Sequence, residues 1–364
     1  MAKRACTRLS AVHASIREGI VTGEYGPGRR LPTRVELEKK YGVSWLTVQQ
    51  AVGQLEQEGF VASRGRVGTF VTDYPPHLCR YGFVYSTPQT PYTNWSLFWL
   101  ALQREVRAHN GVDGRTVLEY YHDHAQPESG NYQRLLGNCR EHLLAGLIFV
   151  TPPHGLEQSP LLTDPNIKRA GIMLEPHEGI PTLSCDFPEF YRRAFTHFAQ
   201  RGKWRLAMIL GEGNHDKPVM PWTKDLKASG LTTRPEWVHH LYLGAGYTAR
   251  SIVQLLMSAA PEERPDALLV SDDNLVEGVL SGLATARGGA GQEVEVVAHW
   301  NFPNRVPRIM PVTYLGFDCG QIVRSCLECI DRQRAGEPVS PRSLIAPIFE
   351  SEWSKNTVST LKHE

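Results

Sequence analysis

The feature that most constrains this chain is a series of helix and turn signals between residues 31 and 71. Gly42 permits a tight turn between two helices, and Ser44 follows it as a natural N-cap for the second helix. Apolar residues at helical spacing predict which face of the second helix packs inward: Val48, Ala51, Val52 and Leu55. A glycine-rich hairpin is then expected at 65–71. Helix, turn, helix and hairpin in this order predict a winged helix-turn-helix.

The side chains that leave the apolar face form a candidate DNA-binding surface. In such a unit the second helix enters the major groove, and basic residues of the hairpin lie along the phosphate backbone. The candidate DNA-binding residues are Arg34, Ser44, Trp45, Thr47, Gln49, Gln50, Arg64 and Arg66. Residues 1–72 carry a charge balance of +5, whereas the rest of the chain carries −4. This distribution favours phosphate binding over a role in protein contacts alone.

The segment 7–72 resembles the reader domain of the GntR family of bacterial regulators. The family's motifs occur in order, from Leu31-Pro32-Thr33 to the Gly68-Thr69-Phe70-Val71 strand, behind a first helix with an apolar stripe of Leu9, Val12, Ile16 and Ile20. The resemblance implies double-stranded operator DNA as a partner. Val35, Trp45 and Gln49 stand where the family usually has arginines that reach DNA. We therefore expect an unusual operator, with Arg34 as a partial compensation.

The 364 residues are too many for one winged helix, so a second folding unit is expected. Pro75 and Pro76 favour an extended linker. The expected organisation is a reader at 1–72, a linker at 73–79, a large domain at 80–353 and a tail at 354–364.

Strand-like and helix-like segments alternate through the large domain. Strands are expected at 81–85, 116–121, 146–150, 172–174, 206–210, 267–270, 294–298 and 312–315. Helices are expected at 95–109, 132–142, 190–199, 275–286 and 321–334. The alternation predicts an α/β fold with a doubly wound parallel sheet, in two lobes.

In such sheets ligands bind beyond the carboxyl ends of the strands, where this chain has carboxylates, amides and aromatic rings. These groups suit a polyhydroxylated ligand, because polar atoms pair with hydroxyls while rings pack on the apolar face of a sugar. The alternative interpretation is a set of ordinary polar loops. The candidate ligand-binding residues in these positions are Tyr92, Asn94, Trp95, Glu175, Asp186, Asp273, Trp300 and Asn301.

Residues 80–353 are similar to the effector domain of LacI/GalR regulators, which shares its fold with type I periplasmic sugar-binding proteins. The matching segments are 80–84, 144–149, 267–273 and 295–299. The resemblance implies that Asp273 binds the effector. It also marks Lys217 as the candidate substitute for the family's arginine, and Trp300-Asn301 as the replacement of an acidic pair. We therefore expect an altered effector pocket.

A GntR-type reader joined to a LacI-type sensor is also the layout of arabinose repressors. This layout predicts a homodimeric transcriptional repressor whose operator affinity is controlled by a small carbohydrate. The alternatives are an aminotransferase-like enzyme fused to a DNA reader, or a carbohydrate-binding protein without a regulatory role. No nucleophile-elbow pattern or cofactor-lysine context is recognisable, so we expect neither an enzyme nor a cofactor.

Two short motifs could suggest a metal site, but each lacks further ligands. Cys326 and Cys329 have no second cysteine pair near them, and His122 and His124 have no further metal ligands near them. No metal is therefore expected. The seven cysteines are scattered, as in reduced intracellular proteins. The sequence shows no apolar signal core and no run of the ~20 apolar residues that would span a bilayer, which predicts a cytoplasmic protein.

Overall fold

The computed structural model describes residues 2–86, 95–121, 130–211, 222–305 and 307–360. The chain forms two compact units. Unit 1 contains residues 1–87, 108–181 and 326–341, and unit 2 contains residues 88–107, 182–325 and 342–364. None of the helices in the described ranges is both long and apolar enough to cross a membrane.

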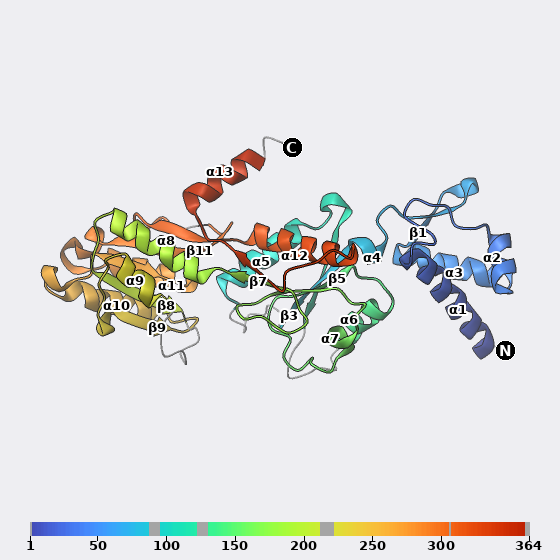
Figure 1. Cartoon of the computed structure of the whole chain (residues 1–364), viewed down its shortest axis with the longest axis horizontal. Helices are drawn as coiled ribbons and strands as arrows, with labels where there is room; N and C mark the ends of the chain where they lie inside the picture. Colours follow the sequence, from blue (N-terminus) through green and yellow to red (C-terminus); the bar gives the residue numbers. More distant parts are fainter. Residues whose placement is uncertain (1, 87–94, 122–129, 212–221, 306, 361–364) are drawn as a thin grey trace. The chain divides into compact units, whose positions relative to one another are not determined.

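The N-terminal part of unit 1 is a winged helix-turn-helix, which we call the reader (Figure 1). Its elements are α1 (Ala2–Val21), α2 (Arg34–Tyr41), α3 (Trp45–Glu58), β1 (Val61–Ser63), the 3₁₀ turn η1 (Gly65–Val67) and β2 (Thr69–Val71). Three residues of the predicted α1 stripe, Val12, Ile16 and Ile20, and the predicted inner face of α3 are buried in one core, and Leu9 packs against it partly buried. Both helix predictions are confirmed.

One six-stranded sheet has the order β13-β7-β6-β5-β3-β4. Its strands are β3 (Arg80–Tyr85), β4 (Thr116–Tyr121), β5 (Gly146–Phe149), β6 (Arg169–Ile172), β7 (Thr182–Cys185) and β13 (Arg342–Ile345). The helices that come directly before or after strands of this sheet in the chain are α4 (Pro76–Cys79), α5 (Leu97–Ala108), α6 (Gly130–Arg140), α7 (Pro160–Thr163) and α12 (Cys319–Arg334), with η2 (Val112–Gly114). Strands β3 and β5 pair in parallel and are buried throughout most of their length.

The second six-stranded sheet lies in unit 2 and has the order β14-β12-β11-β10-β8-β9. Its strands are β8 (Leu206–Gly211), β9 (Val238–Leu241), β10 (Ala267–Val270), β11 (Glu295–Phe302), β12 (Thr313–Asp318) and β14 (Ile348–Phe349). Only the β12–β14 pairing is antiparallel among the pairings described for this sheet.

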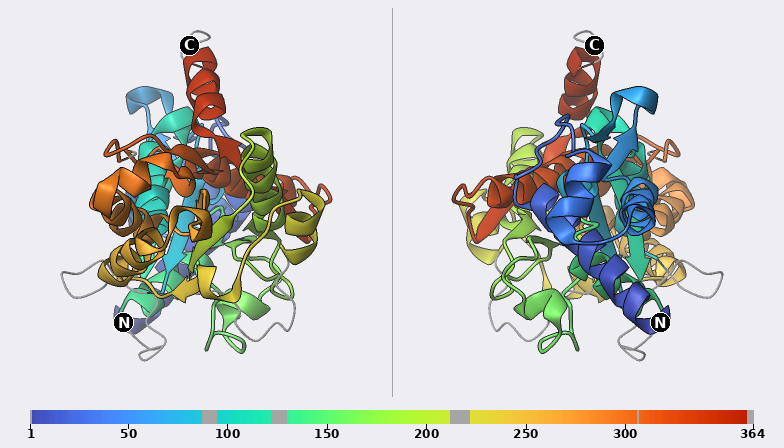
Figure 2. Two further views of the ribbon diagram at one scale, coloured as in Figure 1. Left: turned by 90° about the vertical axis from the view of Figure 1, so that its left-hand side faces the viewer. Right: turned by 90° about the vertical axis from the view of Figure 1, so that its right-hand side faces the viewer.

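Five further helices of unit 2 each come after a strand in the chain. They are α8 (Phe187–Gln200), α9 (Thr223–Ala228), α10 (Gly246–Ser258), α11 (Asp273–Ala284) and α13 (Glu350–Thr360), with η3 (Pro235–Trp237), η4 (Pro261–Glu263) and η5 (Arg287–Glu293). Figure 2 shows α13 in red, beside the label of the C-terminus. The predicted α/β class with parallel sheets is confirmed.

The linker prediction is wrong in one respect. An extended chain was expected around Pro75 and Pro76, but Pro76 begins the helical turn α4. Proline is tolerated at the first position of a helix because its missing N–H would have no partner there, and its fixed φ suits the helix. Only Pro75, with φ −68° and ψ 151°, is extended.

Candidate DNA-binding surface and ligand site

Two caps position the reader's helix-turn-helix. The Thr33 backbone N–H donates to the Glu36 carboxylate at 2.7 Å, while the Glu36 N–H donates to the Thr33 hydroxyl at 3.3 Å, which closes a capping box on α2. The Thr33 N–H and the Thr33 hydroxyl both donate to the Glu36 carboxylate, and these two hydrogen bonds lower the pKa of Glu36. Gly42 adopts a left-handed conformation with φ 61°, and Ser44 caps α3 by accepting from the Thr47 N–H. The direction of α3 is therefore fixed from both ends of the turn.

The outer face of α3 carries the predicted base-reading residues. Gln49 and Gln50 are exposed, and the side chain of Trp45 is 49% exposed. The Arg34 guanidinium lies 5.5 Å from the centre of the Trp45 ring, so α2 and α3 present a joined cationic and aromatic surface. Thr47 is half-buried, and its hydroxyl lies 3.0 Å from that of Ser44.

The wing carries the other predicted contacts. Arg64 lies over the Phe70 ring at 4.8 Å, and Arg66 is exposed at the tip. Arg30 was not among the predicted residues, although its backbone pairs with Phe70 as a third, one-residue strand of the wing. Arg29 and Arg30 are both exposed. The next residue, Leu31, also joins the wing, because its N–H donates to the Thr69 carbonyl. The sequence signal that could have indicated Arg29 and Arg30 was their position directly before Leu31.

In unit 2 the ends of β10 and β11 bring a buried carboxyl group beside an amide. Asp272 caps α11 by accepting from the Asn274 N–H at 2.9 Å, which turns Asp273 into the first helical residue. Asp273 is only 3% exposed, and the Asn301 amide donates to its carboxylate at 2.6 Å. Burial raises the pKa of Asp273 to about 7, against the lowering effect of the Asn301 hydrogen bond. The group can therefore accept or donate a hydrogen bond near neutral pH.

His299 stands two residues before Asn301, and the two side chains share a face of β11 because strand side chains alternate. Its ring lies 5.5–5.7 Å from the ring centres of Phe187, Phe190 and Phe317. Burial lowers the pKa of His299 to about 4, so the imidazole is neutral at pH 7. Neither of its nitrogens, nor the Asn301 carbonyl oxygen, has a hydrogen-bond partner within the described part of the chain.

Buried polar atoms without partners are uncommon in folded proteins. We call Asp273, His299 and Asn301 the unit 2 polar cluster. It offers a carboxyl group, an amide oxygen and an imidazole inside an aromatic surround, which suits hydrogen bonding to a small hydroxylated molecule. His299 was not among the predicted site residues, although period-two alternation from Asn301 pointed to it.

The other predicted ligand residues are distributed more widely. Trp300 lies in the apolar core of unit 2, on the opposite face of β11, and its indole N–H donates to the Asn304 carbonyl at 2.9 Å. Asp186 caps α8 by accepting from the Glu189 N–H. Trp95 is 8% exposed and meets Trp99 edge to face, whereas Glu175 is an exposed residue of unit 1. Tyr92, Asn94 and Lys217 lie outside the described residues.

Of the two metal-like motifs, the described residues include only Cys326 and Cys329. Within the described ranges no group of three His, Cys, Asp or Glu side chains could hold a metal ion. Burial raises the pKa of both Cys326 and Cys329, which disfavours the thiolate form that binds metals. His122 and His124 lie outside the described residues.

Comparison with known proteins identifies the reader. Residues 9–71 match the family model of bacterial regulatory proteins, gntR family. HTH-type transcriptional regulator Rv1152 of Mycobacterium tuberculosis is 37% identical over 65 residues, which are 18% of this chain and 54% of that protein. HTH-type transcriptional regulator TauR of Rhodobacter capsulatus is 38% identical over 227 residues, covering 57% of this chain and 42% of TauR.

A third relative is the arabinose metabolism transcriptional repressor of Geobacillus stearothermophilus, which is 30% identical over 76 residues, 21% of this chain and 21% of that protein. The chain thus spans about half, or less, of the length of these curated relatives.

Solved structures identify the fold of the remaining chain. A regulatory protein of the LacI family from Chloroflexus aggregans superposes with a TM-score of 0.56 at 16% identity, covering 74% of this chain and 96% of its own. The Escherichia coli transcriptional repressor ascG gives 0.55 at 14% identity, covering 74% and 97%. A LacI family regulator from Lactobacillus casei with bound sucrose gives 0.52 at 15% identity, covering 74% and 98%. The chain therefore joins a gntR-type reader to a fold that LacI-family regulators share.

Proposed function

We propose that this chain is a transcriptional repressor that binds operator DNA through α3 and the wing and is released by a small carbohydrate bound at the unit 2 polar cluster. The observation that carries the proposal is the gntR-type reader. Its helix α3 exposes Gln49 and Gln50, and the caps Gly42 and Ser44 fix the turn that precedes this helix. Amide side chains can pair bidentately with adenine in the major groove.

The sensing half of the proposal rests on the unit 2 polar cluster. Sugar hydroxyls both donate and accept hydrogen bonds, so they can pair with the Asp273 carboxyl, the Asn301 oxygen and the His299 nitrogens together. A fold shared with regulators solved with sucrose and with glucose supports a carbohydrate as the ligand. The relative named as an arabinose metabolism transcriptional repressor supports repression, with release by the ligand, as the direction of control.

The first experiment tests DNA binding without assuming an operator. The full chain is used to select duplexes from a random-sequence pool, and the enriched sequence is measured by fluorescence anisotropy. Specific binding should exceed binding to unrelated duplex by at least about 10³-fold, the lower bound for sequence-specific readers. A pool that shows no enrichment would overturn the DNA-reading half of the proposal.

The second experiment tests ligand and site together. A thermal-shift screen of pentoses, hexoses, disaccharides and uronic acids should find a carbohydrate that stabilises the protein. Asp273→Ala should weaken that ligand by ~1.5–3 kcal/mol, the range for hydrogen bonds to charged groups. Glu277→Ala, an exposed acid one turn further along α11, is the matched control and should bind normally. Normal binding by the Asp273 variant in calorimetry would place the ligand elsewhere.

A further inference from the structure

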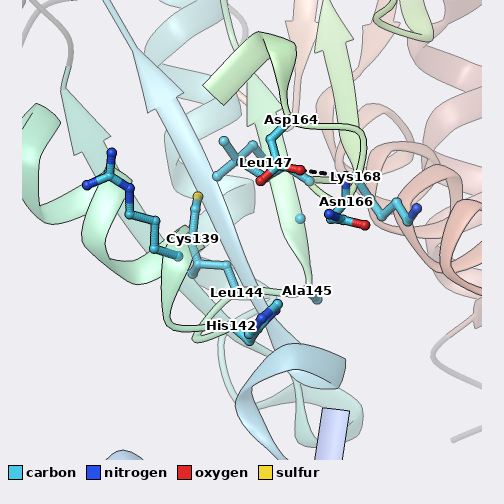
Figure 3. Close-up of a pocket in the computed structure, with 11 residues that line it drawn as sticks. Cys139, His142, Leu144, Ala145, Leu147, Asp164, Asn166 and Lys168 are labelled. Atoms are coloured by element: carbon cyan, nitrogen blue, oxygen red, sulfur yellow. Dashed lines mark hydrogen bonds between the residues drawn. The ribbon is translucent and has the colours of Figure 1, made fainter. Parts of the chain in front are cut away.

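Unit 1 contains a cavity of about 260 Å³, lined by the turn that follows α6, the start of β5 and the segment that precedes β6 (Figure 3). Its charged lining residues are of both signs, because Arg140 and Lys168 are accompanied by Asp164. This lining therefore selects neither an anion nor a cation. The reader, in contrast, exposes a surface whose chemistry indicates one class of partner.

The amino-terminal turn of α3 exposes two large apolar side chains. Trp45 and Leu46 are the first two residues of this helix, and they are 49% and 57% exposed. Neither belongs to the buried core of the reader or to the partly buried residues that pack against that core. Both side chains are therefore available to a partner.

Large exposed apolar residues are unevenly distributed over the reader. Among the reader residues whose side chains the structure describes, they are Val35, Trp45, Leu46 and Val67. Val35 lies in the first turn of α2, and Val67 lies in the wing turn η1. Helix α1 contributes none from residue 8 onward, where its side chains are described. Apolar residues that are scattered singly need no explanation, but these are confined to the elements that carry the candidate DNA-binding residues.

The charges beside Trp45 favour a polyanionic partner. The Arg34 guanidinium lies 5.5 Å from the centre of the Trp45 ring. Glu36 is the acidic residue in the first turns of α2 and α3, and its carboxylate already accepts from the N–H and the hydroxyl of Thr33. An apolar surface beside a free cation matches the major groove, whose phosphates attract the cation, better than it matches the apolar face of a protein.

The outer face of α3 continues with amides. Gln49 follows Trp45 by four residues and Gln50 follows Leu46 by four, and residues at this spacing are neighbours on a helix surface. Both glutamines are exposed. An A·T pair presents the adenine N7 and N6 groups to an amide on the same edge that carries the thymine methyl group. This face of α3 therefore combines the two kinds of group that an A·T pair requires.

Base edges in the major groove limit what an apolar side chain can read. Thymine presents an apolar group there, its C5-methyl, whereas the other three bases present hydrogen-bonding groups. Residues at the amino end of a recognition helix are those that contact base edges. We propose that Trp45 and Leu46 read thymine methyl groups, so that the first turn of α3 selects A·T pairs in each half-site. The proposal rests on the proposed function and names the base chemistry that its reader recognises.

Deoxyuridine tests the proposal, because it differs from thymidine only by the missing C5-methyl group. The operator enriched from the random pool is remade with deoxyuridine at one thymine at a time, and anisotropy measures its binding to the full chain at fixed salt. Affinity should fall about fourfold at one thymine or more in each half-site, the effect of leaving one methyl-sized group unburied. Equal affinity for every form, or an enriched half-site without thymine, would overturn the proposal and leave DNA reading intact. A pool without enrichment would instead overturn the function on which the proposal rests.

Variants assign each methyl contact to its side chain. Trp45→Ala and Leu46→Ala should each reduce the deoxyuridine effect at one thymine to less than about twofold, the range within which independent changes add. Because the ratio of affinities is measured within one protein, a general loss of affinity or stability cancels. Leu255→Ala, which removes a 71% exposed leucine of α10 in unit 2, is the control and should keep the fourfold ratio. An undiminished ratio in both α3 variants would show that the methyl group acts through DNA shape, and would overturn the proposal.

Discussion

At the scale of single residues, the buried carboxyl group of Asp273 links protonation to stability. Its pKa of about 7 in the folded protein lies well above the ordinary value near 4 of an exposed aspartate. Between these two values the folded protein holds a proton that the unfolded chain releases. The free energy of unfolding therefore falls as the pH rises from about 4 to about 7.

We predict that Asp273→Asn removes this part of the pH dependence. The amide cannot ionise, and its oxygen can still accept from Asn301. The wild-type protein should lose up to about 4 kcal/mol across the window, at about 1.4 kcal/mol per pKa unit, and the variant should be the more stable protein at pH 8. Urea unfolding at pH 5 and pH 8 measures the difference, with Glu277→Gln as a control. Parallel pH profiles for wild type and Asp273→Asn would contradict the prediction.

At the scale of elements, we expect the wing to contribute to DNA affinity but not to base preference. Arg64 and Arg66 are exposed on it, and phosphate contacts are sequence-independent and release counterions. We predict that Arg64→Ala/Arg66→Ala weakens binding to every duplex and reduces the slope of log affinity against log salt by about 2, near 0.9 for each lost contact. Anisotropy titrations at several salt concentrations measure the slope.

Two single variants control this wing experiment. Gln50→Ala on α3 should alter base preference and keep the salt slope, because an amide reads a base edge and carries no charge. Arg287→Ala removes an exposed arginine of unit 2 and should change neither property. A wing variant with the wild-type slope would remove the proposed phosphate contacts.

Among the strands, the sequence was most informative where apolar runs are short and sharply bounded. Strands β4 and β10 begin and end where they were expected. Strand β6 was expected at 172–174 and lies instead at Arg169–Ile172, because it begins with a buried arginine and Leu174 is 62% exposed. Helix α10 was not predicted at all, although Ala249, Val253 and Met257 are buried at helical spacing.

The unit 2 polar cluster was predictable only in part, because the end of strand β11 was misplaced. Strand β11 was expected to end at residue 298, but it continues to Phe302 and carries His299 and Asn301 on one face. Polar residues at a strand end resemble a loop until the neighbouring strand is known. Pairing of His299 with Leu315 and Asn301 with Phe317 on β12 extends the strand. That partner is distant in sequence, so local patterns could not reveal it.

At the scale of the whole molecule, we predict that the protein binds DNA as a dimer. One recognition helix contacts too few base pairs to select a single genomic site, and dimers read two half-sites about one helical turn or more apart. Inserting five base pairs between the half-sites of the selected operator should abolish tight binding.

Control by the ligand is a second prediction at this scale. Saturating carbohydrate should shift the operator affinity by ~1–3 kcal/mol, a usual coupling energy. A 1:1 complex by light scattering would contradict the dimer, and an affinity unchanged by a bound carbohydrate would contradict the control by the ligand.

The alternation of side chains along β11 has a consequence for how such a sensor can diverge. Ala298, Trp300 and Phe302 belong to the core, whereas His299 and Asn301 belong to the polar face. Under the proposed function, point changes at the second pair would alter which ligand is bound while the core packing of the strand persists. Gain or loss of one codon within this strand would exchange the two sets, because a one-residue slip reverses every side chain. New specificities along this strand should therefore arise by substitution, and length changes should be confined to the loops that flank it.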